Sequence, residues 1–334
     1  MVEKLAVSRS ACMGTHCAIR LLDLSKTFGR RRRKVKAVRR INLEVATGQV
    51  YGFLGPNGAG KSTTIRMILD LIRPSRGEVH LFDQPIKQNP SILQQRVGGL
   101  VEGAEFYPFL TGRRNLEVIA RTGGFYDEAR IEMLLAQVNM ADRADRPVKG
   151  YSTGMKQRLG LAAALLSDPE LVILDEPTNG LDPAGIQEMR HFIRELVEEN
   201  GKTVFLSSHL LSEVEQVCDQ VAIINNGNII REGQVAELLA AQHQLHIEAE
   251  PLQKVTAVLH NHWPITCENN SVTVTAARKD TPHIVRKLVE NEIAIFQVCS
   301  QRQSLEAFFL KVTSPLEVTD QEATGEPLME GTDG

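Results

Sequence analysis

Long apolar runs are missing from this chain of 334 residues. No run approaches the roughly 18 apolar residues that a membrane-spanning helix needs. The N-terminus also lacks the apolar segment of a secretion signal. We therefore expect the chain neither to span a bilayer nor to be secreted, and any work at a membrane would require docking to a protein that lies in it.

Cysteine is scarce and scattered. An odd number of separated cysteines is typical of free thiols in a reducing compartment and argues against a disulfide framework. No second Cys/His pair stands near the closest two, Cys12 and Cys17, so the sequence also argues against a zinc site. The five cysteines are Cys12, Cys17, Cys218, Cys267 and Cys299.

A strong charge of one sign is also missing. The formal net charge is −3 and the isoelectric point is about 6.3, which argues against a protein that binds nucleic acid through its overall charge. The one dense basic run, Arg30–Lys34, follows Phe28 at the position of a hairpin tip. It is either a solvated loop or a contact for an anionic lipid or nucleotide.

A glycine-rich segment is the most informative feature that is present. It fits the pattern G-x-x-x-x-G-K-[ST] and follows the apolar run Val50–Leu54, which predicts a strand, a phosphate-binding loop and a helix that starts near Lys61. Backbone N–H groups and the helix dipole would bind phosphate, Lys61 would reach the β- and γ-phosphates, and Ser62 would hold Mg²⁺. The predicted loop residues are Gly55, Pro56, Asn57, Gly58, Ala59, Gly60, Lys61, Ser62 and Thr63.

Short apolar runs alternate with helical segments between residues 18 and 235, which is typical of a buried parallel sheet with helices on its faces. The stretch 88–166 is mainly helical, and we interpret it as a helical subdomain inserted in this α/β core. The pair Asn226-Gly227 predicts a two-residue hairpin that closes the domain.

The two ends of the chain differ from this core. Residues 245–313 alternate strand-like and helical segments and predict a small α+β accessory domain after a helical linker, Val235–Ala241. Residues 1–17 show no periodicity and are expected to form a flexible arm. Residues 314–334 contain acidic residues but no basic or aromatic ones, and we expect an acidic disordered tail.

Two carboxylates end a second apolar run, Leu171–Leu174, where a buried strand would bring them to the edge of the sheet. Strands often stop at charged residues, but a phosphate-binding loop upstream gives this pair a chemical role. Asp175 would hold Mg²⁺ through water, and Glu176 would polarise the attacking water as the general base.

A third segment, Tyr151–Leu159, lies between these two motifs. Taken alone, Ser152 would be a helix N-cap. In this order the segment resembles the signature motif of the nucleotide-binding subunits of ABC transporters, usually Leu-Ser-Gly-Gly-Gln. Ser152 and Gly154 are kept, whereas three positions differ. The resemblance covers about residues 18–235 and implies an ABC ATPase domain, a P-loop NTPase fold with a mixed sheet core and a helical subdomain.

The resemblance implies an ATPase that uses ATP and Mg²⁺ and works as a homodimer or as a dimer with a similar cassette. In the family, the signature motif of one subunit (here Ser152 and Gly154) meets the γ-phosphate on the P-loop of the other. Asp182 matches the key residue of the D-loop. His209 matches the switch histidine at the γ-phosphate, although a lone histidine after a strand is more often structural.

Two further matches are looser. Phe28 stands where the family has an aromatic residue that stacks on adenine, and the alternative is a core phenylalanine. Glu102 stands where the family has a glutamine that touches Mg²⁺ and the attacking water. A carboxylate can still bind the metal, but it adds negative charge beside Asp175 and Glu176.

The remaining inferences concern partners. The aromatic segment Glu105–Thr111 matches the surface that receives a helix of the transmembrane subunit, although burial is the default for such residues. The altered signature, Glu102 and the segment Ser304–Leu310 resemble the bacitracin and daunorubicin export subgroup, whose members pair with a separate ABC-2 type permease. This implies a place on the cytoplasmic face of the cell membrane and export of a drug, peptide or lipid-like molecule.

Two alternatives stay open. One is a soluble ABC ATPase of translation or DNA repair, which usually has two cassettes or a long coiled coil. This chain shows one cassette and no sustained heptads. The other is a regulatory ATP-binding module that has lost hydrolysis.

Overall fold

The computed structural model of the chain describes residues 16–29, 34–101, 105–240, 243–268, 271–276 and 278–302. Within these ranges every helix is too short or too polar to cross a bilayer. Several predictions lie outside the described residues: Cys12 and most of the N-terminal arm, Arg30–Arg33, Glu102, the segment Ser304–Leu310 and the acidic tail.

A six-stranded sheet forms the centre of the larger part of the chain, in the order β10-β9-β3-β8-β7-β6. All neighbouring strands run parallel except β9 and the edge strand β10, which are antiparallel. Three apolar strands are buried along their whole length, as the sequence predicts. The strands are β3 (Val50–Leu54), β6 (Val97–Leu100), β7 (Leu171–Asp175), β8 (Thr203–Ser208), β9 (Gln220–Asn225) and β10 (Asn228–Gln234).

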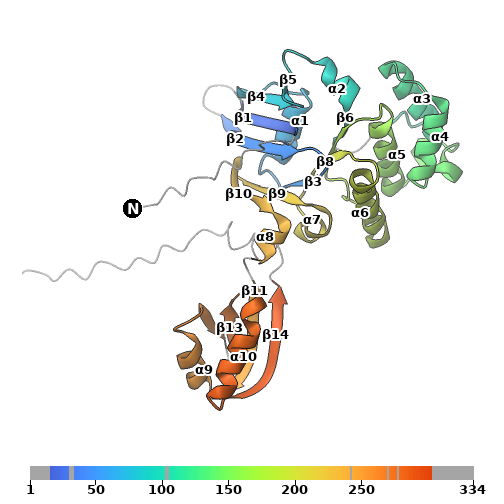
Figure 1. Ribbon diagram of the computed structural model, residues 1–334. Coiled ribbons are helices and arrows are strands. Elements are labelled where there is room, and N and C mark those ends of the chain that lie inside the picture. The colour runs from blue at the N-terminus through green and yellow to red at the C-terminus, as the bar shows by residue number, and fades with distance from the viewer. Residues whose placement is uncertain are drawn as a thin grey trace, which may run out of the picture.

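A second sheet, which is antiparallel, covers one side of the central sheet (Figure 1). Buried residues of both sheets and of α1 share one hydrophobic cluster, in which the rings of Tyr51 and Phe205 stack with centroids 5.8 Å apart. The elements of this part are β1 (Cys17–Phe28), β2 (Val35–Ala46), α1 (Lys61–Ile68), β4 (Arg76–Leu81), β5 (Gln84–Pro85) and α2 (Ser91–Arg96).

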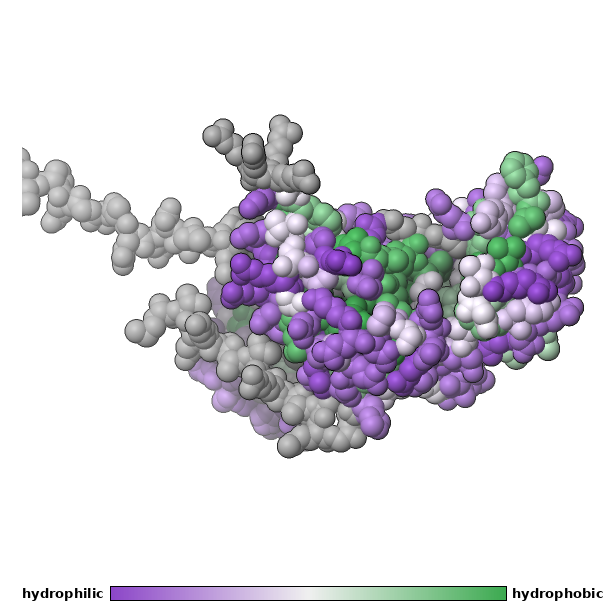
Figure 2. All heavy atoms as spheres, turned by 90° about the horizontal axis from the view of Figure 1, so that it is seen from above, coloured by the Kyte–Doolittle hydropathy of each residue, from purple (hydrophilic) through white to green (hydrophobic). Residues whose placement is uncertain are grey.

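Helices cover the other side of the central sheet, and α3 and α4 lie side by side at the end remote from β1 and β4 (Figure 1). From above, hydrophobic side chains gather in the middle of the visible face and are flanked by hydrophilic ones (Figure 2). The helices are α3 (Gly112–Gly123), α4 (Glu128–Gln137), α5 (Thr153–Leu165), α6 (Pro183–Glu198), α7 (Leu211–Val217) and α8 (Val235–Ala240).

The stretch 88–166 includes one strand, β6, which belongs to the central sheet beside β7. The expectation of a helical segment is therefore wrong for residues 97–100. Two glycines conceal this strand in the sequence because glycine has a low strand propensity. A Cβ atom on Gly98 would lie 2.0 Å from the carbonyl oxygen of Ala164, so the close packing of β6 on α5 requires glycine.

The predicted hairpin at Asn226-Gly227 is confirmed. Asn225 of β9 pairs with Asn228 of β10. Asn226 and Gly227 have positive φ angles of 48° and 79°, which is the backbone that a two-residue hairpin turn requires.

The C-terminal part forms a separate four-stranded antiparallel sheet in the order β12-β13-β11-β14 (Figure 1). The chain order strand-helix-strand-strand-helix-strand is that of the ferredoxin-like pattern. The apolar face of the sheet packs on α9 and α10 through residues such as Ile247, Leu259 and Ile284. The elements are β11 (His243–Glu250), α9 (Leu252–Leu259), β12 (Ile265–Glu268), β13 (Ser271–Thr275), α10 (Thr281–Glu290) and β14 (Ala294–Arg302).

Candidate nucleotide-binding site

The loop between β3 and α1 requires glycine at three positions, Gly55, Gly58 and Gly60. Gly58 and Gly60 have φ angles of +79° and +114°. A Cβ atom on Gly60 would lie 2.6 Å from the carbonyl oxygen of Ala37, and one on Gly55 would lie 2.3 Å from that of Ile224. The loop therefore combines a left-handed backbone with close packing beneath it.

Helix α1 directs its N-terminus at this loop. Its N-cap is Gly60, with no side-chain cap and no acidic residue in the first turn. No side chain therefore competes for the first N–H groups, and the positive end of the helix dipole is uncompensated. Ser62 and Thr63 lie half-buried in this turn, while Pro56 and Asn57 are exposed on the loop. These features fit a bound phosphate chain.

Lys61 is buried, with an exposed fraction of 5%. Its ammonium group donates to the carbonyl oxygen of Gly55 at 2.7 Å and lies 3.1 Å from Oε1 of Glu176. A buried charge needs such partners. The structure therefore brings the lysine of the loop against the predicted general base.

Glu176 follows directly after β7 and has a left-handed φ of 51°. Its Oε2 atom lies 2.7 Å from Nδ1 of His209. The carboxylate is thus held between Lys61 on one side and His209 on the other, and the structure brings these three predicted residues together.

Asp175 ends β7 and is buried, with an exposed fraction of 4%. Its carboxylate accepts a hydrogen bond from the hydroxyl of Ser207 at 2.5 Å. Helix α1, which carries Ser62, packs against β7. No cluster of three metal-ligating side chains occurs among the described residues. One carboxylate and one hydroxyl fit Mg²⁺, which commonly takes its other ligands from phosphates and water.

The predicted signature residues lie at the start of α5 and face the segment Asn179–Asp182 of the same chain, which contains the predicted D-loop residue Asp182. Ser152 caps the helix by accepting the N–H of Met155 at 3.2 Å. A Cβ atom on Gly154 would lie 3.2 Å from Leu181, and one on Gly180 would lie 3.2 Å from Thr153. The two segments therefore pack closely, and a larger residue at either glycine would require the facing side chain to shift.

Asp182 caps α6 by accepting the N–H of Gly185 at 3.2 Å. Phe28 ends β1 with an exposed fraction of 40%, and Nζ of Lys26 lies 5.1 Å from its ring centroid. The alternative of a core phenylalanine is therefore wrong for Phe28.

Sequence reasoning missed several polar residues behind the site. The buried Gln157 of α5 donates to the carbonyl oxygen of Pro177 at 3.1 Å. Thr178 donates to the carboxylate of Glu213 at 2.5 Å, and both side chains are buried. The local sequence gives no signal for their burial, since Gln157 stands between Lys156 and Arg158 and Glu213 follows Ser212.

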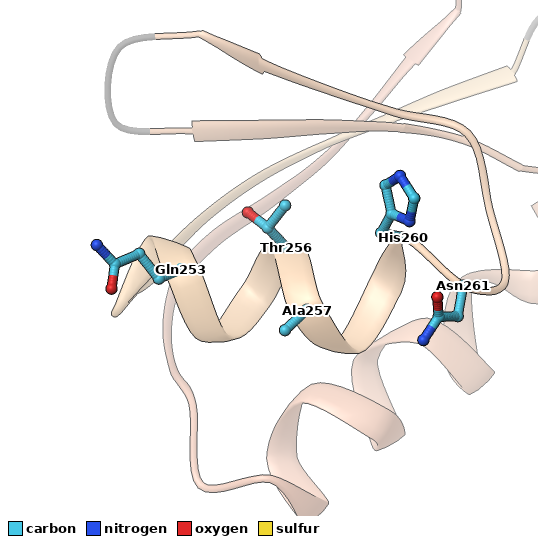
Figure 3. Close-up of a pocket in the computed structure, with 5 residues that line it drawn as sticks. All are labelled: Gln253, Thr256, Ala257, His260 and Asn261. Carbon is cyan, nitrogen blue, oxygen red and sulfur yellow. The ribbon is translucent and has the colours of Figure 1, made fainter.

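A shallow depression lies elsewhere, on α9 of the C-terminal sheet domain (Figure 3). None of the predicted site residues lines it, and its lining carries no carboxylate. The lining residues are Gln253, Thr256, Ala257, His260 and Asn261.

Known proteins resemble this chain over most of its length. The pattern of the family described as "ABC transporter" matches residues 38–179. The uncharacterised ABC transporter ATP-binding protein YhcH of Bacillus subtilis is 39% identical over 82% of this chain and 90% of its own length. The bacitracin transport ATP-binding protein BcrA of Bacillus licheniformis is 38% identical over 88% of this chain and 96% of its own length.

Solved structures show the same fold. CbiO1 of Clostridium perfringens, part of the ABC transporter complex cbiONQ, has a TM-score of 0.60 and 25% identity, and the match covers 74% of this chain and 97% of that one. A dimeric ATP-binding cassette, MJ0796 bound to ADP and phosphate, has a TM-score of 0.60 at 24% identity, over 65% and 98% of the two chains. The P-loop ABC cassette predicted from the sequence is therefore confirmed. Since the chain spans most of the length of relatives that are more than 30% identical to it, it belongs to the ATP-binding, ATP-hydrolysing subunits of the ABC transporter family.

Proposed function

We propose that this chain drives an ABC-2 type exporter from the cytoplasmic face of the membrane, as a homodimer or as a dimer with a similar cassette. The contacts of Glu176 with Lys61 and with His209, behind the glycine-rich loop, carry the proposal of active hydrolysis. Two relatives are named bacitracin transport ATP-binding proteins, that of Bacillus licheniformis at 38% identity and that of Enterococcus faecalis at 35%, and they support export of a drug, peptide or lipid-like molecule.

In this proposal each residue has a defined task. The loop N–H groups and Lys61 bind the β- and γ-phosphates of ATP, and Phe28 stacks on adenine. Ser62, Asp175 and Glu102 would hold Mg²⁺, which would supply positive charge beside the phosphate oxygens. Ser152, Gly154 and Asp182 act across the dimer interface.

The base has to be released before it can work. Its Oε1 atom is paired with Lys61 in the structure, so this oxygen is occupied by the ammonium group and not open to water. A triphosphate carries more negative charge than one carboxylate, so Lys61 would turn to the phosphates and leave Oε1 of Glu176 to accept a proton from water. His209 would keep the other oxygen, Oε2, in place.

The surface for the permease is the loop before α3. Tyr107 and Phe109 have exposed fractions of 63% and 81%. The buried amide of Asn115 holds this loop by accepting the N–H of Tyr107 at 2.8 Å and donating to its carbonyl oxygen at 3.1 Å. Exposed aromatic side chains on a rigid loop are typical of an interaction site.

A tagged copy purified from its own host in mild detergent tests the proposal. We expect a polytopic membrane protein in stoichiometric amount. Replacing Tyr107 and Phe109 together with serine should remove that protein and leave ATP binding intact. Tyr126→Ser is the matched control, because Tyr126 is an exposed aromatic residue of the same subdomain whose ring contacts Arg121. Recovery with ribosomes or DNA, or alone, would contradict the exporter proposal.

A further inference from the structure

Ser207 lies at the centre of the carboxylate pair although no motif names it. It stands on β8 directly opposite Asp175 of β7 in the parallel pairing, and its exposed fraction is 0%. Its hydroxyl lies 2.5 Å from Oδ1 of Asp175 and 3.0 Å from the backbone nitrogen of Glu176. One hydroxyl thus touches both residues to which the proposed function assigns hydrolysis.

The donor and the acceptor of each of these two hydrogen bonds follow from the groups involved. The backbone N–H of Glu176 can only donate, so the hydroxyl oxygen accepts from it. The single hydroxyl proton is then free for the carboxylate of Asp175, which makes a charge-assisted bond. Among the described residues, Ser207 is the sole hydrogen-bond partner of that carboxylate.

The same contact fixes an uncommon backbone. Glu176 has a φ of 51°, and a residue other than glycine keeps such a conformation only when its surroundings enforce it. Its N–H donates to both the hydroxyl and the carbonyl oxygen of Ser207, the latter at 3.2 Å. The neighbouring Ser208 differs, since its hydroxyl accepts the N–H of Leu210.

We propose that Ser207 is a positioning residue for the metal site: its hydroxyl orients the Asp175 carboxylate toward Mg²⁺ and keeps Glu176 in line with the attacking water. The inference rests on the proposed function, in which Asp175 is the metal ligand. Partners that orient a ligating carboxylate commonly change metal affinity 10- to 100-fold when removed.

Metal binding tests the inference without turnover. Mn²⁺ is titrated into the full chain with a non-hydrolysable ATP analogue, and free Mn²⁺ is followed by electron paramagnetic resonance. We expect Ser207→Ala to lower the affinity for Mn²⁺ about 10- to 100-fold. The affinity for the analogue without metal should stay within about twofold of the wild-type value. Ser207→Thr keeps the hydroxyl and should retain most of the affinity. Ser207→Cys, with a weaker donor of similar size, replaces the alanine variant if that one does not fold.

Thr203→Val is the matched control. Thr203 is buried on the same strand, and its hydroxyl accepts the N–H of Gly48 far from the carboxylates. Unchanged Mn²⁺ affinity in folded Ser207→Ala, or an equal loss in Thr203→Val, would overturn the inference. Asp175→Asn distinguishes a failure of this inference from a failure of the proposed function. Normal Mn²⁺ affinity in that variant would contradict the metal site itself.

Discussion

The ammonium nitrogen of Lys61 lies 3.1 Å from Oε1 of Glu176, across the mouth of the glycine-rich loop. Both groups come from segments that end at the same edge of the central sheet, because β3 and β7 flank β8 in parallel. The two charges therefore neutralise each other in the structure, and in the proposed function a bound nucleotide would separate them. This relationship makes both residues sensitive to substitution, for different reasons.

Replacing the base should stop hydrolysis after ATP has bound. We expect Glu176→Gln to lower kcat by about 10²- to 10⁴-fold, the range for loss of a general base, and to trap an ATP-bound dimer. Size-exclusion chromatography with ATP and a phosphate-release assay measure the two effects. Glu78→Gln is the control for an exposed carboxylate that becomes an amide. Undiminished turnover in Glu176→Gln would remove it from this role.

Removing the lysine should abolish nucleotide binding itself. In Lys61→Ala the phosphates lose their buried cation, so we expect no measurable ATPase activity and no rise of Tm when ATP is added. Comparing Tm with and without ATP separates loss of binding from loss of folding. A normal ATP-induced rise would contradict the P-loop assignment.

Phe28→Ala should weaken the binding of ATP without changing the rate of the chemical step. A stacking contact is worth about 1 kcal/mol, so we expect KM for ATP to rise about fivefold at an unchanged kcat. Phe28→Trp keeps an aromatic face and serves as the control. An unchanged KM in the alanine variant would place adenine elsewhere.

The pair of Arg96 and Glu170 predicts a dependence of stability on pH. Two hydrogen bonds from the guanidinium, at 2.5 and 2.6 Å, lower the pKa of Glu170 from its ordinary value of 4.5. The folded-state pKa is depressed, so the stabilisation is complete above pH 4.5 and is lost as pH falls through the lowered pKa. Because Glu170 is more than half exposed, we expect less than about 1 kcal/mol.

Unfolding in urea at pH 7 and pH 3 measures this effect. The wild-type protein should be more stable than Glu170→Gln at pH 7, and the difference should be smaller at pH 3. An equal difference at both values would mean that the carboxylate charge contributes nothing.

We expect a truncation after Ala240 to leave the core of the ATPase domain intact, whereas a truncation after Gly233 should destabilise it. Val235 is buried, its N–H donates to the carbonyl oxygen of Asp219 at 3.0 Å, and Leu238 packs on the core. Removing one buried valine costs about 1.5 to 3 kcal/mol, so the shorter chain should unfold at a lower Tm.

We expect the chain that ends at Ala240 to hydrolyse ATP and to dimerise more weakly than the full chain. The reason is that we propose a regulatory or dimer-stabilising role, rather than a catalytic one, for the C-terminal domain. Light scattering and ATPase assays measure both properties. If dimerisation, rate and permease binding were all unaltered, that role would be excluded.

Local constraints made much of the fold predictable. The glycine loop, the hairpin at Asn226-Gly227 and the buried strands each depend on neighbouring residues, because positive φ angles, turn chemistry and apolar runs are properties of short segments. The strand β6 was missed for the same kind of reason, since Gly98 and Gly99 give no local strand signal.

By itself, the sequence determined which residue types are available for nucleotide chemistry. Its patterns place Lys61 after a glycine-rich loop at the start of a helix, and Asp175 and Glu176 at the end of an apolar strand. Only the tertiary structure decided how they meet. Strand order puts Ser207 opposite Asp175 and brings His209 to Glu176. Such contacts join segments far apart in the chain, and their geometry follows from how sheets and helices pack rather than from any local pattern.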